Sequence, residues 1–99
     1  MSFVTAQPEI LTAAAGSLSG IGDSMTAGVT AAAVPTTGVT APAADLVSAM
    51  TAAQFSAHGS LFQEVSAQAA AVHQQIVATL GGNANAYAFT EAVNATAAG

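Results

Sequence analysis

Apolar and small residues recur along two stretches of this chain at alternating spacings of three and four. Such spacing places the recurring residues on one side of an α-helix and is typical of helices that pack side by side. Residues 34–42, between the two stretches, contain two prolines, a glycine and three threonines. Because this composition interrupts helices and forms turns, the sequence predicts an all-α fold in which two helices form an antiparallel hairpin.

Proline and acidic residues mark where each helix should begin. Pro8 suits the first turn because a helix leaves that N–H without a partner, and Glu9 suits the positive end of the helix dipole. Pro42 is expected to open the second helix in the same way, with Asp45 in its first turn or as its cap. We therefore place the first helix at about residues 8–33.

Two consecutive glycines mark the expected end of the second helix. Glycine favours helix termination, and residues 81–82 are both glycine. We therefore place the second helix at about residues 43–80 and divide the chain into a helical hairpin, residues 1–82, and a C-terminal tail, residues 83–99. The tail is rich in alanine, so the sequence leaves open whether it continues the helix or frays.

Each helix carries one column of recurring residues and further large apolar side chains outside it. The first column comprises Leu11, Ala14, Leu18, Ile21, Met25, Gly28 and Ala32, and the second comprises Phe55, His58, Phe62, Val65, Ala69, Val72, Ile76 and Thr79. Val29 and Met50 are among the large side chains outside the columns. Helices that are apolar on more than one side pack against more than one neighbour.

A hairpin of this composition needs a second chain, identical or different, to complete its core. Of the 99 residues 27 are alanine, which favours helices but buries little more than one methyl group. The spacing does not decide which column faces the other helix and which faces the partner chain. We predict that the hairpin and partner interfaces together comprise Leu11, Leu18, Ile21, Met25, Val29, Met50, Phe55, Phe62, Val65, Val72 and Ile76.

The charge composition excludes several classes of function. The chain has no Lys or Arg and five Asp or Glu, for a net charge of −5. Without cations it cannot neutralise nucleic-acid phosphates, and it has no electrostatic attraction to anionic lipids. It also contains no cysteine, which removes disulfides and thiolate metal sites.

Nothing in the sequence suggests catalysis, a cofactor or a metal site. The two histidines, His58 and His73, are about 22 Å apart on one helix and cannot share an ion. We interpret His58 as a packing residue of the second column and His73 as a surface residue. The acidic residues form no pair at helical spacing, whereas general acid–base catalysis needs ionisable groups brought together at one site.

One pair of residues near the C-terminus forms a candidate recognition patch. Tyr87 is the only tyrosine, and Glu91 follows it by four positions, so on a helix the phenol and carboxylate would share one face. The N-terminus lacks the basic and apolar regions of a signal peptide, and no stretch is long enough to span a membrane. The protein is therefore expected to stay in the cytoplasm or to leave it without an N-terminal signal.

Several short motifs, in their order and spacing, resemble the PE family of mycobacterial proteins. They are Met1-Ser2-Phe3-Val4, Pro8-Glu9, Pro35-Thr36-Thr37-Gly38, Pro42-Ala43-Ala44-Asp45, Val47-Ser48-Ala49 and Tyr87-x-x-x-Glu91. The resemblance covers essentially the whole chain and suggests a short form that consists of the PE domain only. It implies a non-enzymatic protein whose hairpin completes a four-helix-type bundle with a PPE-family partner.

The same resemblance implies a route out of the cell. PE–PPE pairs are exported by type VII (ESX) secretion systems, and an EspG-type chaperone in the cytoplasm binds the PPE subunit. Carried onto this chain, Tyr87 and Glu91 are the secretion signal, and the protein ends secreted or at the cell surface. Two other readings remain open: a self-associating four-helix homodimer affecting envelope permeability, and a small hydrolase or metal enzyme.

Overall fold

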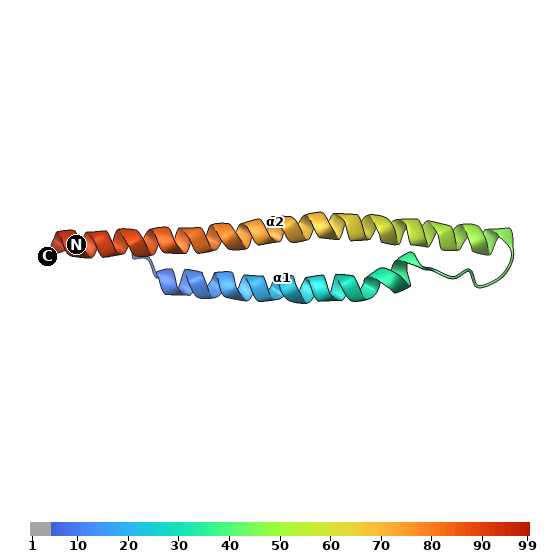
Figure 1. Cartoon of the computed structure of the whole chain (residues 1–99), viewed down its shortest axis with the longest axis horizontal. Coiled ribbons are helices and arrows are strands. Elements are labelled where there is room, and N and C mark those ends of the chain that lie inside the picture. Colours follow the sequence, from blue (N-terminus) through green and yellow to red (C-terminus); the bar gives the residue numbers. More distant parts are fainter. Residues whose placement is uncertain (1–4) are drawn as a thin grey trace. The chain divides into compact units, whose positions relative to one another are not determined.

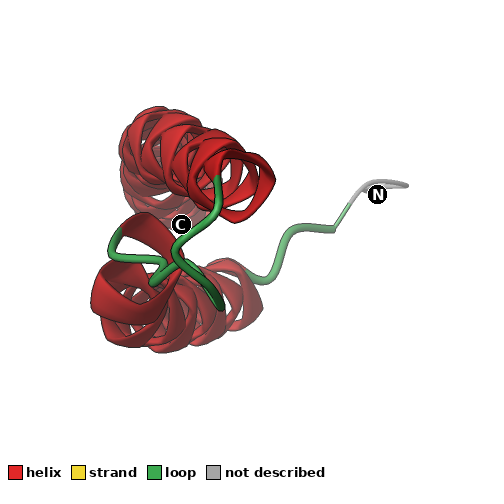
Figure 2. Ribbon diagram, turned by 90° about the vertical axis from the view of Figure 1, so that its right-hand side faces the viewer, coloured by secondary structure: helices red, strands yellow, loops and turns green. Residues whose placement is uncertain are grey.

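The computed structural model describes residues 5–99, which form two α-helices joined by a loop (Figure 1). Helix α1 spans Pro8–Thr37 and α2 spans Leu46–Ala98. Helices and loops account for all of residues 5–99, with no strand (Figure 2). The predicted all-α fold with two helices is therefore confirmed. The motif at residues 1–4 that contributes to the family resemblance lies outside the described residues.

The helices divide into two compact units, each of which pairs part of α1 with part of α2. The first unit combines the described residues up to Gly22 with His73–Gly99, and the second is Asp23–Val72. Within the second unit, the Gln63 amide donates to the carbonyl of Val29 at 3.1 Å. Nearer the loop, the backbone N–H of Val39 donates to the Ser56 hydroxyl at 3.2 Å. These contacts show that the two helices of the second unit run antiparallel.

Helix α1 continues past its expected end at residue 33, because the last turn tolerates a proline. Pro35 lies inside the helix and has no N–H to donate to the preceding turn. The hydroxyl of Thr37 donates to the carbonyl of Ala33 at 2.7 Å, and the N–H of Gly38 donates to the carbonyl of Val34 at 3.0 Å. These bonds use carbonyls that a helix end otherwise leaves unsatisfied.

Helix α2 begins at Leu46 rather than at residue 43, so the expectation that Pro42 opens it is wrong. The helix begins where a side chain satisfies its first free N–H groups. The Asp45 carboxylate accepts the backbone N–H of Ser48 at 2.9 Å and the Ser48 hydroxyl at 2.7 Å. The carbonyl of Asp45 accepts the N–H of Ala49 at 3.1 Å. Asp45 is therefore the N-cap of α2, the second of its two expected roles.

The expected end of α2 at residue 80 is also wrong, because α2 continues through both glycines to Ala98. Glycine ends a helix when it adopts a left-handed conformation. Only Gly99 does so among the described glycines, with φ of 77°, and its N–H donates to the carbonyl of Thr96 at 3.3 Å. Two glycines inside a helix destabilise it by about 1 kcal/mol each relative to alanine, and the alanines that follow them favour the helix. The expected boundary at residue 82 therefore lies inside continuous helix.

The N-cap predicts a pH dependence of stability. Hydrogen bonds from the backbone and hydroxyl of Ser48 hold the pKa of Asp45 below its usual value of 3.8. A carboxyl whose pKa is lowered by folding contributes stability above its unfolded pKa, and this is lost as pH falls through the folded-state pKa. We expect Asp45→Ala to lower the melting temperature at neutral pH, with the difference from the unaltered chain disappearing in acid.

Circular dichroism melts of both proteins across pH 2–7 (about the range over which carboxyls titrate) measure this difference. Asp23→Ala is the control, because it removes the same charge from an exposed position inside α1. An equal loss of stability in the control, or a pH-independent loss in Asp45→Ala, would contradict the capping role.

Candidate partner interface

The least exposed residues define the surface on which α1 and α2 meet, and we call them the hairpin seam. They recur at spacings of three and four, as in other packed helix pairs. In the first unit the seam contains Leu11, Ala15, Leu18 and Gly22 of α1 with His73, Val77, Leu80 and Ala84 of α2. In the second unit it contains Val29 and Ala32 of α1 with Ala52, Ser56, Gly59, Gln63, Ser66 and Ala70 of α2.

Small and polar residues dominate the α2 side of the seam. The buried apolar residues among those described are three alanines, Ala15, Ala52 and Ala84, and no large side chain is fully buried. At Gly59 a Cβ atom would collide with the carbonyl group of Thr36, so the backbones come very close there. The two helices therefore approach closely but bury little apolar surface, about one methyl group at each alanine.

His73 lies in the hairpin seam of the first unit, and His58 is exposed, which reverses the interpretation from sequence. The His73 Nε2 atom is 2.6 Å from the carbonyl oxygen of Leu18. A carbonyl only accepts hydrogen bonds, so Nε2 carries the proton in this contact. The ring fills the space beside Gly22, where a Cβ would lie 2.6 Å from its Cδ2 atom. This contact fixes how the two helices of the first unit are aligned.

Large apolar side chains line the side of each unit next to the seam, and we call this side the apolar flank. In the second unit it comprises Phe55, Phe62, Val65 and Val72, which are 49–63% exposed. In the first unit it comprises Ile21 and Ile76, both more than half exposed. Exposed large apolar side chains that share one side of a protein make that side a candidate interaction surface.

The flank residues of α1 and α2 lie on the same side of a unit. In the first unit, Ile21 directly precedes the seam residue Gly22, and Ile76 directly precedes the seam residue Val77. One residue corresponds to a rotation of about 100° around a helix. Because paired helices run in opposite directions, the same backward step along each sequence moves both side chains to one side. Ile21 and Ile76 therefore form a single surface.

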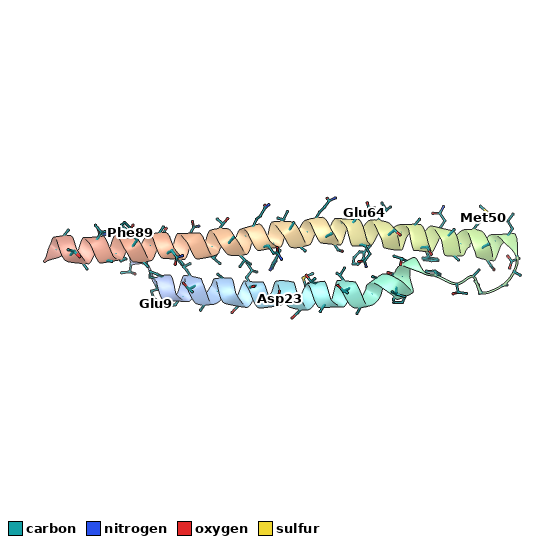
Figure 3. All side chains as sticks on the ribbon, viewed as in Figure 1. Glu9, Asp23, Met50, Glu64 and Phe89 are labelled. Atoms are coloured by element: carbon teal, nitrogen blue, oxygen red, sulfur yellow. The ribbon has the colours of Figure 1, made fainter. Side chains whose placement is uncertain are left out.

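Acidic residues occupy the opposite side. Glu9 directly follows the α1 residue Pro8 in the first unit, and Glu64 directly follows the seam residue Gln63 in the second (Figure 3). Asp23 follows Gly22 in the same way and begins the second unit (Figure 3). A forward step rotates these carboxylates away from the apolar flank. Each unit therefore has an apolar side and a polar, acidic side.

The structure separates the predicted interface residues into two groups. Leu11, Leu18 and Val29 are half-buried in the hairpin seam. The others are exposed, namely Ile21, Met25, Met50, Phe55, Phe62, Val65, Val72 and Ile76. Sequence reasoning missed the small residues that face α1, such as Ser56, Gly59 and Ser66, although their spacing of three and four was visible in the sequence.

Tyr87 and Glu91 are both exposed and belong to the C-terminal part of α2. This end of α2 extends past the start of α1 (Figure 1). Their spacing of four puts them on one face of this helix. No group of three or more His, Cys, Asp or Glu among residues 5–99 could hold a metal ion. Neither helix, within the described part of the chain, is long and apolar enough to cross a bilayer.

Comparison with known proteins identifies the family. The PE family matches residues 4–94. PE13 of Mycobacterium tuberculosis H37Rv is 59% identical over 98 residues, which cover 99% of each chain. PE8 of the same strain is 50% identical over 98 residues, covering 99% of this chain and 36% of PE8. PE_PGRS33 of strain CDC 1551 is 52% identical over 95 residues, covering 96% of this chain and 20% of PE_PGRS33.

These matches cover nearly the whole of this sequence, and the chain belongs to the PE family. The resemblance carried by the Pro8-Glu9 and Tyr87-x-x-x-Glu91 motifs is therefore confirmed at the level of the family. The chain spans almost all of PE13 but only about a third of PE8 and a fifth of PE_PGRS33.

The contact between His73 and Gly22 predicts different effects at two glycines of α1. Gly22→Ala places a methyl group against the His73 ring, which should cost the first unit about 1–3 kcal/mol and cancel or exceed the roughly 1 kcal/mol that alanine adds to the helix. Gly16→Ala is the matched control, because nothing lies within 4 Å of its added Cβ. Alanine should stabilise the helix there by about 1 kcal/mol. Thermal or denaturant melts measure both changes, and a Gly22→Ala as stabilising as Gly16→Ala would contradict the close contact.

Proposed function

We propose that this chain is the non-enzymatic half of a heterodimer with a PPE-family protein. The observation that carries the proposal is the apolar flank: Phe55 and Phe62 are large and exposed, whereas the seam toward α1 is built from small residues. Partner helices that cover the flank would complete a four-helix-type bundle. Membership of the PE family supports a PPE partner, because PE proteins pair with PPE proteins in general.

Charge favours a different chain over a second copy as this partner. The chain carries five acids and no Lys or Arg, so two copies would bring together a net charge of −10 with no cation to offset it. A partner that supplies Lys or Arg beside the flank avoids this repulsion. The alternative is a self-associating protein that affects envelope permeability. Size-exclusion chromatography with light scattering of the chain alone tests it, because a stable homodimer would favour the alternative.

We further propose that type VII (ESX) secretion exports the pair to the cell surface or the medium, with Tyr87 and Glu91 as the signal. The two side chains share one exposed face of α2. Glu91 is the only charged residue after Glu64, so a receptor would find one carboxylate beside one phenol. On the family pattern, an EspG-type chaperone acts on this chain only through its PPE subunit.

The heterodimer predicts a strong effect of the central flank residue. Phe62→Ala should weaken PPE binding by about 3 kcal/mol, on the order of 100-fold in Kd, because the ring would be buried in the complex. Isothermal titration calorimetry or quantitative co-purification with the PPE partner measures this change.

Leu61→Ala is the matched control for Phe62→Ala. Leu61 is also large and 59% exposed, but it lies about a further 100° around α2 from the seam. Its truncation should change Kd by less than about threefold, as expected outside an interface core. Equal effects of the two substitutions would remove the flank as the partner surface.

The export signal predicts a separation between secretion and pairing. Tyr87→Ala and Glu91→Ala should each abolish export and leave the amount of heterodimer in the cytoplasm unchanged, because both residues lie beyond the hairpin seam. Glu91→Asp is the control, and it should be exported because it keeps the carboxylate. Immunoblots of cells and culture filtrate measure export, and normal secretion of both alanine variants would refute the assignment.

A further inference from the structure

The last part of α2 has no packing partner among the described residues. Ala84, only 1% exposed, is the last buried residue of the hairpin seam, and every residue from Asn85 onward is exposed. We call residues 85–98 the α2 tail. Two large apolar side chains stand on it, Phe89 at 72% and Val93 at 50% exposed. Figure 3 labels Phe89 on the end of α2 that extends past the start of α1 at Glu9.

The large side chains of the tail form two pairs on opposite faces. Tyr87 and Glu91 are four residues apart and share one face, and Phe89 and Val93 are four residues apart and share another. Phe89 follows Tyr87 by two residues, which corresponds to a rotation of about 200°. The polar pair therefore faces one way, and the apolar pair faces almost directly away from it.

Phe89, the larger member of the apolar pair, lies off the apolar flank. In the first unit the flank residue Ile76 directly precedes the seam residue, and Thr90 holds the equivalent position fourteen residues later. Phe89 lies one residue further back, about 100° farther around the helix. A partner that covers the flank of the first unit therefore leaves Phe89 uncovered.

Phe89 and Val93 do not stabilise the tail while it is surrounded by water. Apart from them, Tyr87 and Glu91, residues 83–99 are alanine, asparagine, threonine or glycine. Phenylalanine and valine are weaker helix formers than alanine, and a short helix without tertiary contacts is marginal in water. A Phe–Val pair at positions i and i+4 stabilises the tail once it is docked, and this spacing is how an amphipathic helix anchors itself in a groove.

We propose that Phe89 and Val93 dock the α2 tail into an apolar groove of the export receptor, opposite the contacts of Tyr87 and Glu91. This inference rests on the proposed function, because it assigns further specificity residues to the same signal. The groove floor that receives Phe89 and Val93 is apolar. Glu91 carries the only charged side chain on the tail, so the receptor places one Lys or Arg at the rim to pair with it. The receptor therefore contacts two opposite faces of the helix.

The test follows export of the full chain produced together with its PPE partner. Phe89→Ala should lower the exported fraction about tenfold, because the largest apolar anchor is lost. Phe89→Leu should restore export, since it keeps an apolar side chain. Leu61→Ala, which truncates a large apolar side chain at an exposed site of α2 outside the tail, is the control and should be exported normally. Co-purification from the cytoplasm measures pairing, which all three variants should retain.

The outcomes separate this inference from the proposed function. Normal export of Phe89→Ala together with lost export of Tyr87→Ala would overturn the groove and leave the signal standing. Loss of PPE pairing in Phe89→Ala would assign the residue to the heterodimer and also overturn the groove. Normal export of Tyr87→Ala would overturn the proposed signal and, with it, the inference that depends on it.

Discussion

The close approach of α1 and α2 through small residues is the constraint on which the rest depends. At Gly59 the α2 backbone meets the carbonyl of Thr36, and alanines such as Ala52 and Ala84 fill the positions that leucines fill in a self-sufficient helical bundle. A seam of this kind recognises shape but buries little apolar area, so it contributes little stability. The large side chains are consequently free for a second chain. The proposed binding of a partner follows from this arrangement, because a seam of small residues leaves the large side chains exposed.

Polar contacts determine the register of α1 against α2, which the small side chains of the hairpin seam do not fix. Methyl-sized side chains can slide past one another, whereas a directional hydrogen bond has one favourable register. His73 contacts the carbonyl of Leu18 in the first unit, and Gln63 donates to the carbonyl of Val29 in the second. A typical hydrogen bond of this kind adds only about 1 kcal/mol, since water competes for both groups. The main effect of these contacts is therefore to place the apolar flank at a defined position.

Periodicity predicted the two helices, because spacing and capping chemistry are local properties. Pro8 begins α1 and Asp45 caps α2 as their side chains dictate. The seam could not be predicted in the same way, because a hydrophobic pattern ranks positions by side-chain size and so selects Phe55 and Phe62, which do not face α1. Phe55 and Phe62 are exposed because the residues one position later, Ser56 and Gln63, are the ones that face α1. The helix end was misplaced because Gly81 and Gly82 keep helical conformations within an alanine-rich sequence.

Continuous helix across the glycines connects the packing of α1 on α2 to the proposed export signal within the first unit. Tyr87 follows the buried Ala84 by three residues, so the seam fixes the direction in which the phenol points. Gly81 and Gly82 each weaken the helix by about 1 kcal/mol relative to alanine, and neither has a neighbour that a Cβ would meet. Helical structure beyond them therefore depends on the packing of α1 against Leu80 and Ala84. A chain with an unpaired α1 would present Tyr87 and Glu91 on a frayed segment, which would give the proposed export receptor a physical basis for preferring the folded hairpin.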